Sequence, residues 1–271
     1  MRASKYQVVL IATNAACLCA LLLAGTCLDA SLDLDHLVID KVRIVTSEGI
    51  TQSANAIQRV NRLVVDQPLL PGLPRGLLAT RTITISLIRE RLDGIDARAF
   101  PSDLVIAIPA TAVESWTDSK LRRVLRHELM HLALGAALGY AHVPAWFSEG
   151  FAEWGSESLS CEAEARLRLD AVIYGGQSPN IPQLSVKIRN HIDRLGYDYL
   201  QTFFEFLDGR PGHLVSSGRM VESVREHGVV AGLEKAFRAN LRSLEGEWHG
   251  YLRRRFGSFP SGFTCPPSVI D

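Results

Sequence analysis

The sequence predicts an α+β fold, in which a short antiparallel or mixed sheet near the N-terminus packs on a long apolar helix and a mostly helical half follows. Strand-like segments occur only before residue 110, and helical periodicity dominates from about residue 117 to residue 256. The chain has 271 residues, 47% of them hydrophobic, which is enough to bury the core of one compact domain or two small ones.

The first part of the chain combines strands with one helix. Apolar and polar residues alternate over residues 37–45, which favours a strand, and residues 49–66 show helical periodicity. Residues 67–76 contain three prolines and two glycines and are therefore expected to form a loop. β-Branched residues predict a second strand over residues 82–88, and a third strand over residues 104–108 is ended by a proline. We expect these strands to share one small sheet.

A long helix is predicted over residues 117–135. Asp118 or Ser119 can cap its first turn, and Gly135 can end it. Its leucine and valine residues are spread around the helix rather than along one stripe, which indicates that the helix is largely buried. A buried helix needs partners for every polar side chain that it carries.

The remaining segments predict helices with breaks between them. A helix is expected over residues 144–154, followed by a polar helix over residues 159–172 whose mixed charges indicate a solvated face. Residues 175–182 form a turn-rich break, and residues 186–256 are expected to form several helices. Residues 259–271, with three prolines, are expected to be an irregular tail.

The N-terminal segment has the layout of a signal peptide. Arg2 and Lys5 precede an apolar run over residues 8–23, which is shorter than the roughly 20 apolar residues of a membrane-spanning helix. Cleavage after Cys27 or after Ala30 would leave an imperfect recognition site, and lipidation at Cys27 fits less well than simple cleavage. We expect an exported protein, periplasmic or extracellular, that is membrane-anchored only if residues 8–23 are retained.

These patterns divide the chain into three parts. Residues 1–30 are expected to be a signal peptide or signal anchor, and residues 31–258 a single domain. The domain has a sheet-containing part over residues 31–116 and a helical part over residues 117–258. The tail over residues 259–271 completes the chain.

The charge balance disfavours two classes of partner. Lys plus Arg and Asp plus Glu both number 29, so no net charge draws the molecule to nucleic acid or to an anionic membrane surface. We therefore expect no nucleic-acid partner, and membrane contact only through an uncleaved N-terminal segment.

The cysteines predict one disulfide. Cys17, Cys19 and Cys27 lie in or beside the leader, so Cys161 and Cys265 are the only pair in the mature chain. An even pair in an exported protein favours a disulfide. The alternative is two unpaired thiols, one of them buried as a small hydrophobic group.

The predicted buried helix carries the sequence His-Glu-x-x-His. His127 and His131 are four residues apart and share one face of a helix, where both imidazoles can bind one metal ion, for which zinc is best suited. Glu128 lies beside them and can act as general base toward a water molecule. The alternative, a core helix with two incidental histidines, would leave three polar groups buried without partners.

A catalytic zinc needs a third protein ligand and one open position. Glu149 follows His131 after a segment long enough for a loop and a returning helix, and it is our candidate for this ligand. Glu153 shares the helical face of Glu149 and is a rival ligand, or an acceptor that orients a histidine ring. His142, from the connecting loop, is a second rival.

At these residues the sequence resembles the gluzincin zinc metallopeptidases, and especially the small bacterial families called peptidase-MA-like. The resembling segments are residues 104–108, 127–131 and 144–153, in that order, and a weaker similarity covers most of residues 80–255. The resemblance implies that the first of these segments is a strand that lies antiparallel to the bound peptide.

The resemblance also implies roles for single residues. Glu149 would be the third zinc ligand, and Glu153 an acceptor that orients a histidine ring. Related enzymes often use a tyrosine or histidine from the C-terminal helices as a donor to the oxyanion, and Tyr197 lies in the matching neighbourhood, with Tyr199 as reserve. A packing role is the alternative interpretation of Tyr197.

Together these features predict a zinc-dependent peptidase, in the cell envelope or outside the cell, that hydrolyses a peptide or protein substrate with a metal-activated water. One alternative is a catalytically silent metal-binding protein that retains the fold. The other is a membrane-anchored assembly or scaffold protein in which the peptidase helix is incidental. The intact Glu128 favours the enzyme.

Overall fold

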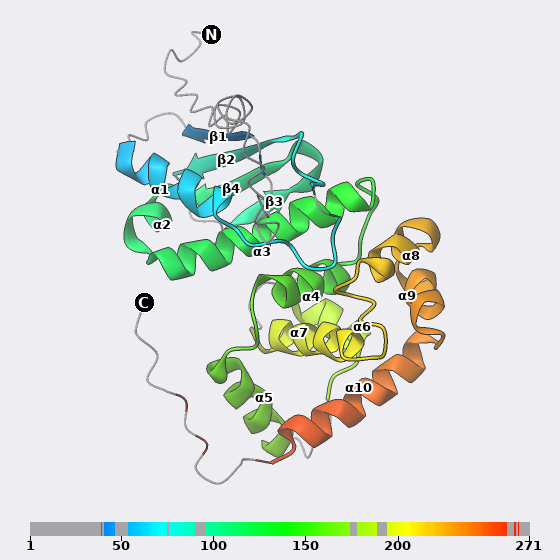
Figure 1. Ribbon diagram of the computed structural model, residues 1–271. Coiled ribbons are helices and arrows are strands. Elements are labelled where there is room, and N and C mark those ends of the chain that lie inside the picture. The colour runs from blue at the N-terminus through cyan, green and yellow to red at the C-terminus, as the bar shows by residue number, and fades with distance from the viewer. Residues whose placement is uncertain are drawn as a thin grey trace, which may run out of the picture.

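The computed structural model describes residues 39, 41–46, 54–74, 76–89, 96–173, 178–188, 194–258, 263 and 265 (Figure 1). The predicted leader, residues 1–30, lies outside this part of the chain. The described residues form a small sheet covered by helices and then a body made of helices, which confirms the predicted α+β class.

The sheet consists of β1 (Lys41–Thr46), β2 (Thr82–Ile88), β3 (Arg98–Phe100) and β4 (Val105–Pro109), in the order β1-β2-β4-β3. β1 and β4 both pair parallel with β2, whereas β3 runs antiparallel to β4, so the sheet is mixed. Alternate residues of β2 point into the core, where Ile83, Ile85 and Leu87 are fully buried.

β3 is the strand that the sequence pattern did not predict. Its three residues are too few to show an alternation of apolar and polar positions. Because β3 covers one edge of β4, residues 105–107 pair with a neighbouring strand on both sides. β4, which covers most of the segment that the resemblance implied would lie antiparallel to a bound peptide, is therefore an inner strand of the sheet. The edge of the sheet belongs to β3, whose outer side has no partner strand among the described residues.

Helices α1 (Ala54–Val65), α2 (Ala110–Ser115) and α3 (Asp118–Ala137) pack on the sheet, as Figure 1 shows. α1 and α3 correspond to the two helices expected in this part of the chain, and the short α2, which directly follows β4, was not predicted. α3 is buried on several sides, as the spread of its apolar residues predicted.

The cap of α3 differs from the prediction. The Oγ1 atom of Thr117 accepts a hydrogen bond from the backbone N–H of Lys120 at 3.2 Å, so Thr117 is the N-cap residue. Asp118, one of the two predicted caps, instead accepts hydrogen bonds from Arg59 and Arg62 of α1 at 2.5 and 2.7 Å. The side chain of Asp118 therefore joins α3 to α1 rather than closing its own helix.

Gly135 lies inside α3 rather than at its end. A β-carbon at Gly135 would lie only 2.5 Å from the Cβ atom of Pro101, in the short 3₁₀ turn η2 (Pro101–Asp103) that follows β3. Glycine is therefore required for the close approach of α3 to this turn. The helix continues to Ala137, and Gly139 adopts the left-handed conformation just beyond it.

Most of the predicted helices of the C-terminal half are present. α4 (Ala145–Ser156) corresponds to the helix expected over residues 144–154, and α5 (Cys161–Ile173) to the polar helix over residues 159–172. α6 (Ile181–Ile188) begins inside the expected break, with Pro182 in its first turn. The described helices that follow are α7 (Arg194–Asp208), α8 (Arg219–His227), α9 (Val229–Phe237) and α10 (Leu241–Phe256).

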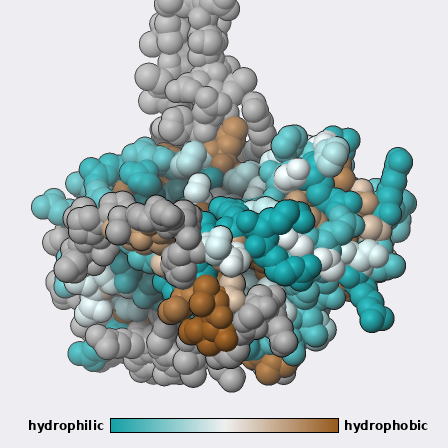
Figure 2. All heavy atoms as spheres, turned by 90° about the horizontal axis from the view of Figure 1, so that it is seen from below, coloured by the Kyte–Doolittle hydropathy of each residue, from teal (hydrophilic) through white to brown (hydrophobic). Residues whose placement is uncertain are grey.

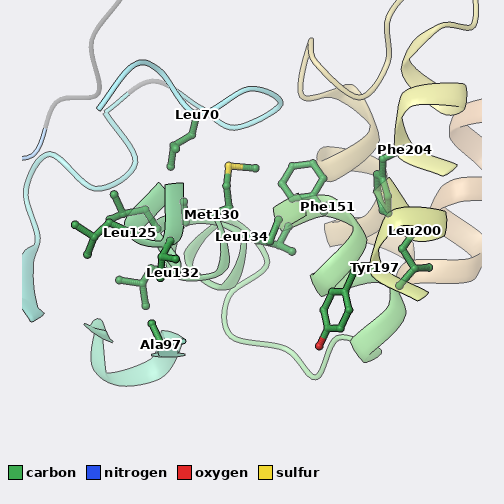
Figure 3. Packing of buried hydrophobic residues seen from close by; sticks show 14 of the residues in the cluster. Leu70, Ala97, Leu125, Met130, Leu132, Leu134, Phe151, Tyr197, Leu200 and Phe204 are labelled. Atoms are coloured by element: carbon green, nitrogen blue, oxygen red, sulfur yellow. The ribbon is translucent and has the colours of Figure 1, made fainter. Parts of the chain in front are cut away.

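Aromatic rings hold α4 against α7. Phe147 and Phe151 of α4 and Phe204 of α7 are fully buried, and the ring of Phe204 lies edge-on to the other two (Figure 3). A β-carbon at Gly150 would lie 2.7 Å from the ring of Phe204, so this glycine permits the contact. Truncation of such a buried phenylalanine to alanine typically costs about 3–5 kcal/mol. This packing fixes the position of α7 relative to α4.

A disulfide joins Cys161, the first residue of α5, to Cys265 in the tail, with a Cα–Cα distance of 5.6 Å. The predicted pairing is thereby confirmed. Arg168 of α5 reinforces the link, because its guanidinium lies over the rings of Phe256 and Phe263 and donates to the backbone carbonyl of Ser258. The tail is therefore attached to α5 both by the disulfide and by the contacts of Arg168.

Three apolar side chains of α5 are exposed to solvent. Leu169, Val172 and Ile173 are each more than half exposed, and their spacing places them on one face of the helix. Figure 2, which views the molecule from below, shows a compact hydrophobic patch within a largely hydrophilic face. None of the helices in the described ranges is long and apolar enough to cross a membrane.

Candidate metal centre

Three ligand atoms converge between α3 and α4. The Nε2 atoms of His127 and His131 lie 3.1 Å apart, and the Oε2 atom of Glu149 lies 3.4 and 3.5 Å from them. Ligands about 2.1 Å from a tetrahedral metal ion lie about 3.4 Å from one another, so these separations fit one ion. The three residues predicted as ligands can thus hold a metal ion together.

Each histidine presents its Nε2 atom to the site and its Nδ1 atom to an oxygen outside it. The Nδ1 atom of His131 lies 2.8 Å from Oγ of Ser148, and the Nδ1 atom of His127 lies 3.8 Å from Oε1 of Glu153. Such oxygens fix the tautomer and the direction of a metal-binding ring. Glu153 lies on the side of His127 where the resemblance implied an acceptor, at a distance longer than a hydrogen bond. Ser148 was not identified from the sequence.

Without a metal ion, the ionisable groups of the site shift one another's pKa values. Burial alone would lower the pKa of His127, but its hydrogen bond to Glu149 and the charges of Glu153 and Glu128 raise that pKa to about 9. Burial would likewise raise the pKa of Glu149, but the two histidines hold it well below its usual range. His127 and Glu149 therefore form an ion pair at neutral pH, and a metal ion would replace the proton.

The side chain of Arg126 holds α3 against its neighbours. Its guanidinium donates to the backbone carbonyls of Gly155, at the end of α4, and of Pro68 and Leu69 in the loop after α1, at 2.8–2.9 Å. The charged residue that interrupts the apolar surroundings of the motif thus ties both helices and the loop together. Its many donors suit it to this role.

The ligands open onto a cleft of about 500 Å³. Glu128, only 6% exposed, is part of the cleft wall beside the histidines. Ala97, Arg98 and Ala99, at and just before the edge strand β3, line the same cleft. The edge of the sheet and the metal ligands thus share one cavity.

Of the two tyrosines considered as oxyanion donors, only Tyr197 lines the cleft. Figure 3 shows its hydroxyl pointing away from Leu200 and Phe204 of the apolar cluster. Burial, together with the nearby carboxylates Glu149 and Glu153, raises the pKa of Tyr197, so its hydroxyl keeps its proton. Tyr199 instead donates to Oδ2 of Asp170 at 2.5 Å, away from the cleft.

Two further residues differ in their position relative to the cleft. His142, the rival ligand, is an exposed loop residue that lines no part of the cleft. Arg194, which the sequence did not single out, lines the cleft and donates two hydrogen bonds to the carboxylate of Glu153. No local pattern could have indicated this pair, because the two residues lie on helices far apart in the chain.

Comparison with known proteins assigns no family to this site. No protein-family model matches the chain, and no curated protein matches it in sequence. The relation to gluzincin peptidases therefore stays a resemblance, carried by the motif and by its spacing to Glu149.

Proposed function

We propose that this protein is a zinc-dependent peptidase that acts after export, in the cell envelope or outside the cell. The observation that carries the proposal is the convergence of His127, His131 and Glu149 on one point, with the carboxylate of Glu128 in the same cleft. Two imidazoles and one carboxylate form the ligand set of many hydrolytic zinc sites, which leave one coordination position open.

Zinc fits these residues better than other common ions, because imidazole nitrogens suit it while calcium and magnesium prefer ligand sets made of oxygen. When bound, zinc would lower the pKa of a water molecule and polarise the carbonyl group of the substrate. Ser148 and Glu153, at the outer nitrogens of His131 and His127, would keep both rings directed at the ion.

Different residues of the chain would then carry out the separate steps of hydrolysis. The carboxylate of Glu128 would accept a proton from the attacking water and pass it to the leaving amine. The hydroxyl of Tyr197, which keeps its proton, would donate a hydrogen bond to the developing oxyanion. A substrate peptide would bind in extended form as an additional strand along the outer edge of β3, which borders the same cleft.

Export is supported by chemistry rather than by the leader itself. The disulfide between Cys161 and Cys265 is a bond that forms and persists in oxidising compartments. This pairing is consistent with the expected periplasmic or extracellular location, and it gives the mature protein a test that does not depend on where the leader is cut.

The decisive experiment measures zinc and hydrolysis in one purified preparation of the mature protein. We expect about one equivalent of zinc by mass spectrometry of metals, cleavage of peptides from a mixed library, loss of cleavage after chelation and recovery after zinc is returned. One equivalent of zinc without any cleavage would favour the silent metal-binding protein. Cleavage that survives complete removal of metal would refute the proposal.

A further inference from the structure

Arg194 makes the most specific polar contact at the border of the site. It is the first residue of α7, and its guanidinium donates to Oε1 of Glu153 at 2.8 Å and to Oε2 at 3.2 Å. The side chain of Glu153 is only 8% exposed, and its Oε1 atom also faces Nδ1 of His127. Both oxygens of this carboxylate are thus held by one planar group.

Arg194 is itself held from the other side. Its Nε atom lies 3.6 Å from Oδ1 of Asp198, whose side chain is completely buried. Asp198 also accepts two hydrogen bonds from Arg166 of α5, at 2.7 and 3.0 Å. The guanidinium of Arg194, whose side chain is 48% exposed, is therefore placed between two buried carboxylates, Glu153 and Asp198.

Arg194 lies at an unfavourable end of α7. A cation in the first turn of a helix lies at the positive end of the helix dipole, where it is disfavoured. The compensation comes from Glu153 on α4 and from Asp198, one turn later on α7 itself. Of these two contacts, the one with Glu153 links α7 to the site.

The contact between Arg194 and Glu153 also bears on which carboxylate of α4 can bind the metal. Glu149 and Glu153 lie one turn apart on α4 and share a face, so either carboxylate could approach the metal position. Only Glu149 lies within 3.5 Å of both Nε2 atoms, while Glu153 is drawn toward Arg194. Without its contact to Arg194, the carboxylate of Glu153 would be free to turn toward the ion or to bind His127 alone.

We infer that Arg194 is a positioning residue that holds Glu153 at the outer nitrogen of His127 and keeps it out of the metal ligand set, leaving Glu149 as the third ligand. The inference rests on the zinc site of the proposed function, but it does not depend on peptide hydrolysis. Its effect is on zinc affinity, through Glu153.

Zinc affinity of the full mature protein, measured by competition with a chromophoric chelator, tests this role. We expect R194M to bind zinc about tenfold more weakly or worse, and R194K to lie between R194M and the parent, since an ammonium cannot bridge both oxygens. R123M is the matched control, because Arg123 has a similar exposure and pairs with Glu157 rather than Glu153. We expect its zinc affinity to equal that of the parent.

A double-mutant cycle with E153Q shows whether Arg194 acts through Glu153. In the E153Q background, R194M should cause little further loss of affinity. An equal loss in both backgrounds would overturn the inference, as would parental affinity in R194M or an equal loss in R123M. If R194M fails to fold, R194K decides in its place, and parental affinity in R194K overturns the inference. A parent protein without zinc affinity would refute the proposed function as well, whereas these other outcomes leave it standing.

Discussion

The Oγ atom of Ser148 lies 2.8 Å from the Nδ1 atom of His131, so that the residue immediately before one ligand orients another. We predict that S148A weakens zinc binding by about tenfold, because the ring of His131 would lose its outer partner. S148T, which keeps the hydroxyl, should retain most of the affinity. Chelator competition compares the three proteins, and equal affinities would assign Ser148 to packing alone.

Glu128 should be needed for turnover but not for metal. E128Q keeps the size of the side chain but cannot accept a proton, so zinc should stay near one equivalent while peptide hydrolysis falls by about 100-fold or more. E114Q, at an exposed position of α2, is the control and should behave as the parent. Full activity in E128Q would mean that the proposed mechanism must be abandoned.

Glu149 should be needed for the metal itself. E149A leaves two protein ligands, so zinc should become extractable by mild chelation, and activity should be lost with it. H142A, in the exposed loop, should hold zinc as the parent does. Tight zinc in E149A combined with loss in H142A would show that the third ligand has been misidentified.

Tyr197 should act in the transition state. Y197F removes only the hydroxyl, so we expect a lower kcat with little change in KM, because a donor to the oxyanion contributes little to binding of the ground state. Y199F serves as the control, since the hydroxyl of Tyr199 is bound to Asp170. Steady-state kinetics of both variants decide, and an unchanged kcat in Y197F would leave it a packing residue.

The raised pKa of His127 gives the metal-free protein a defined pH response. Because this pKa rises from 6.5 to about 9 on folding, the protonated imidazole stabilises the fold fully below pH 6.5 and no longer does so above pH 9. The free energy of unfolding contributed by His127 should therefore decrease between these values.

Zinc must displace the same proton, so its apparent affinity should increase by up to about tenfold per pH unit over this window. Denaturant melts of the metal-free protein and chelator competition at pH 7 and 9.5 measure the two effects. A zinc affinity that does not change over this range would contradict the assignment of the proton to His127.

Local periodicity identified the parts of the molecule that depend on neighbours in sequence. The shared face of His127 and His131, the strand over residues 82–88 and the long buried helix all follow from spacing alone. Glu149 could be proposed because a loop and a returning helix are the simplest connection to it.

Contacts between distant segments could not be read in this way. Arg194 contacts Glu153 only because α7 packs on α4. Gly135 was expected to end its helix, and only the contact with Pro101 explains why glycine is needed inside the helix. β3 is too short to produce a pattern, although its place at the sheet edge decides which strand borders the cleft. Tyr197 and Tyr199 both belong to α7, and only the directions of their side chains distinguish the residue at the cleft from the other.

The three candidate ligands lie within one helix–loop–helix unit, α3 and α4, which are consecutive in the chain. The cleft around them needs α7 and the edge strand β3 as well, which lie on opposite sides of that unit in the sequence. Ligands that are close in sequence meet at a small cost in loop-closure entropy, and the more distant walls meet at a larger one. During folding, the three candidate ligands should thus come together before the walls of the cleft are complete.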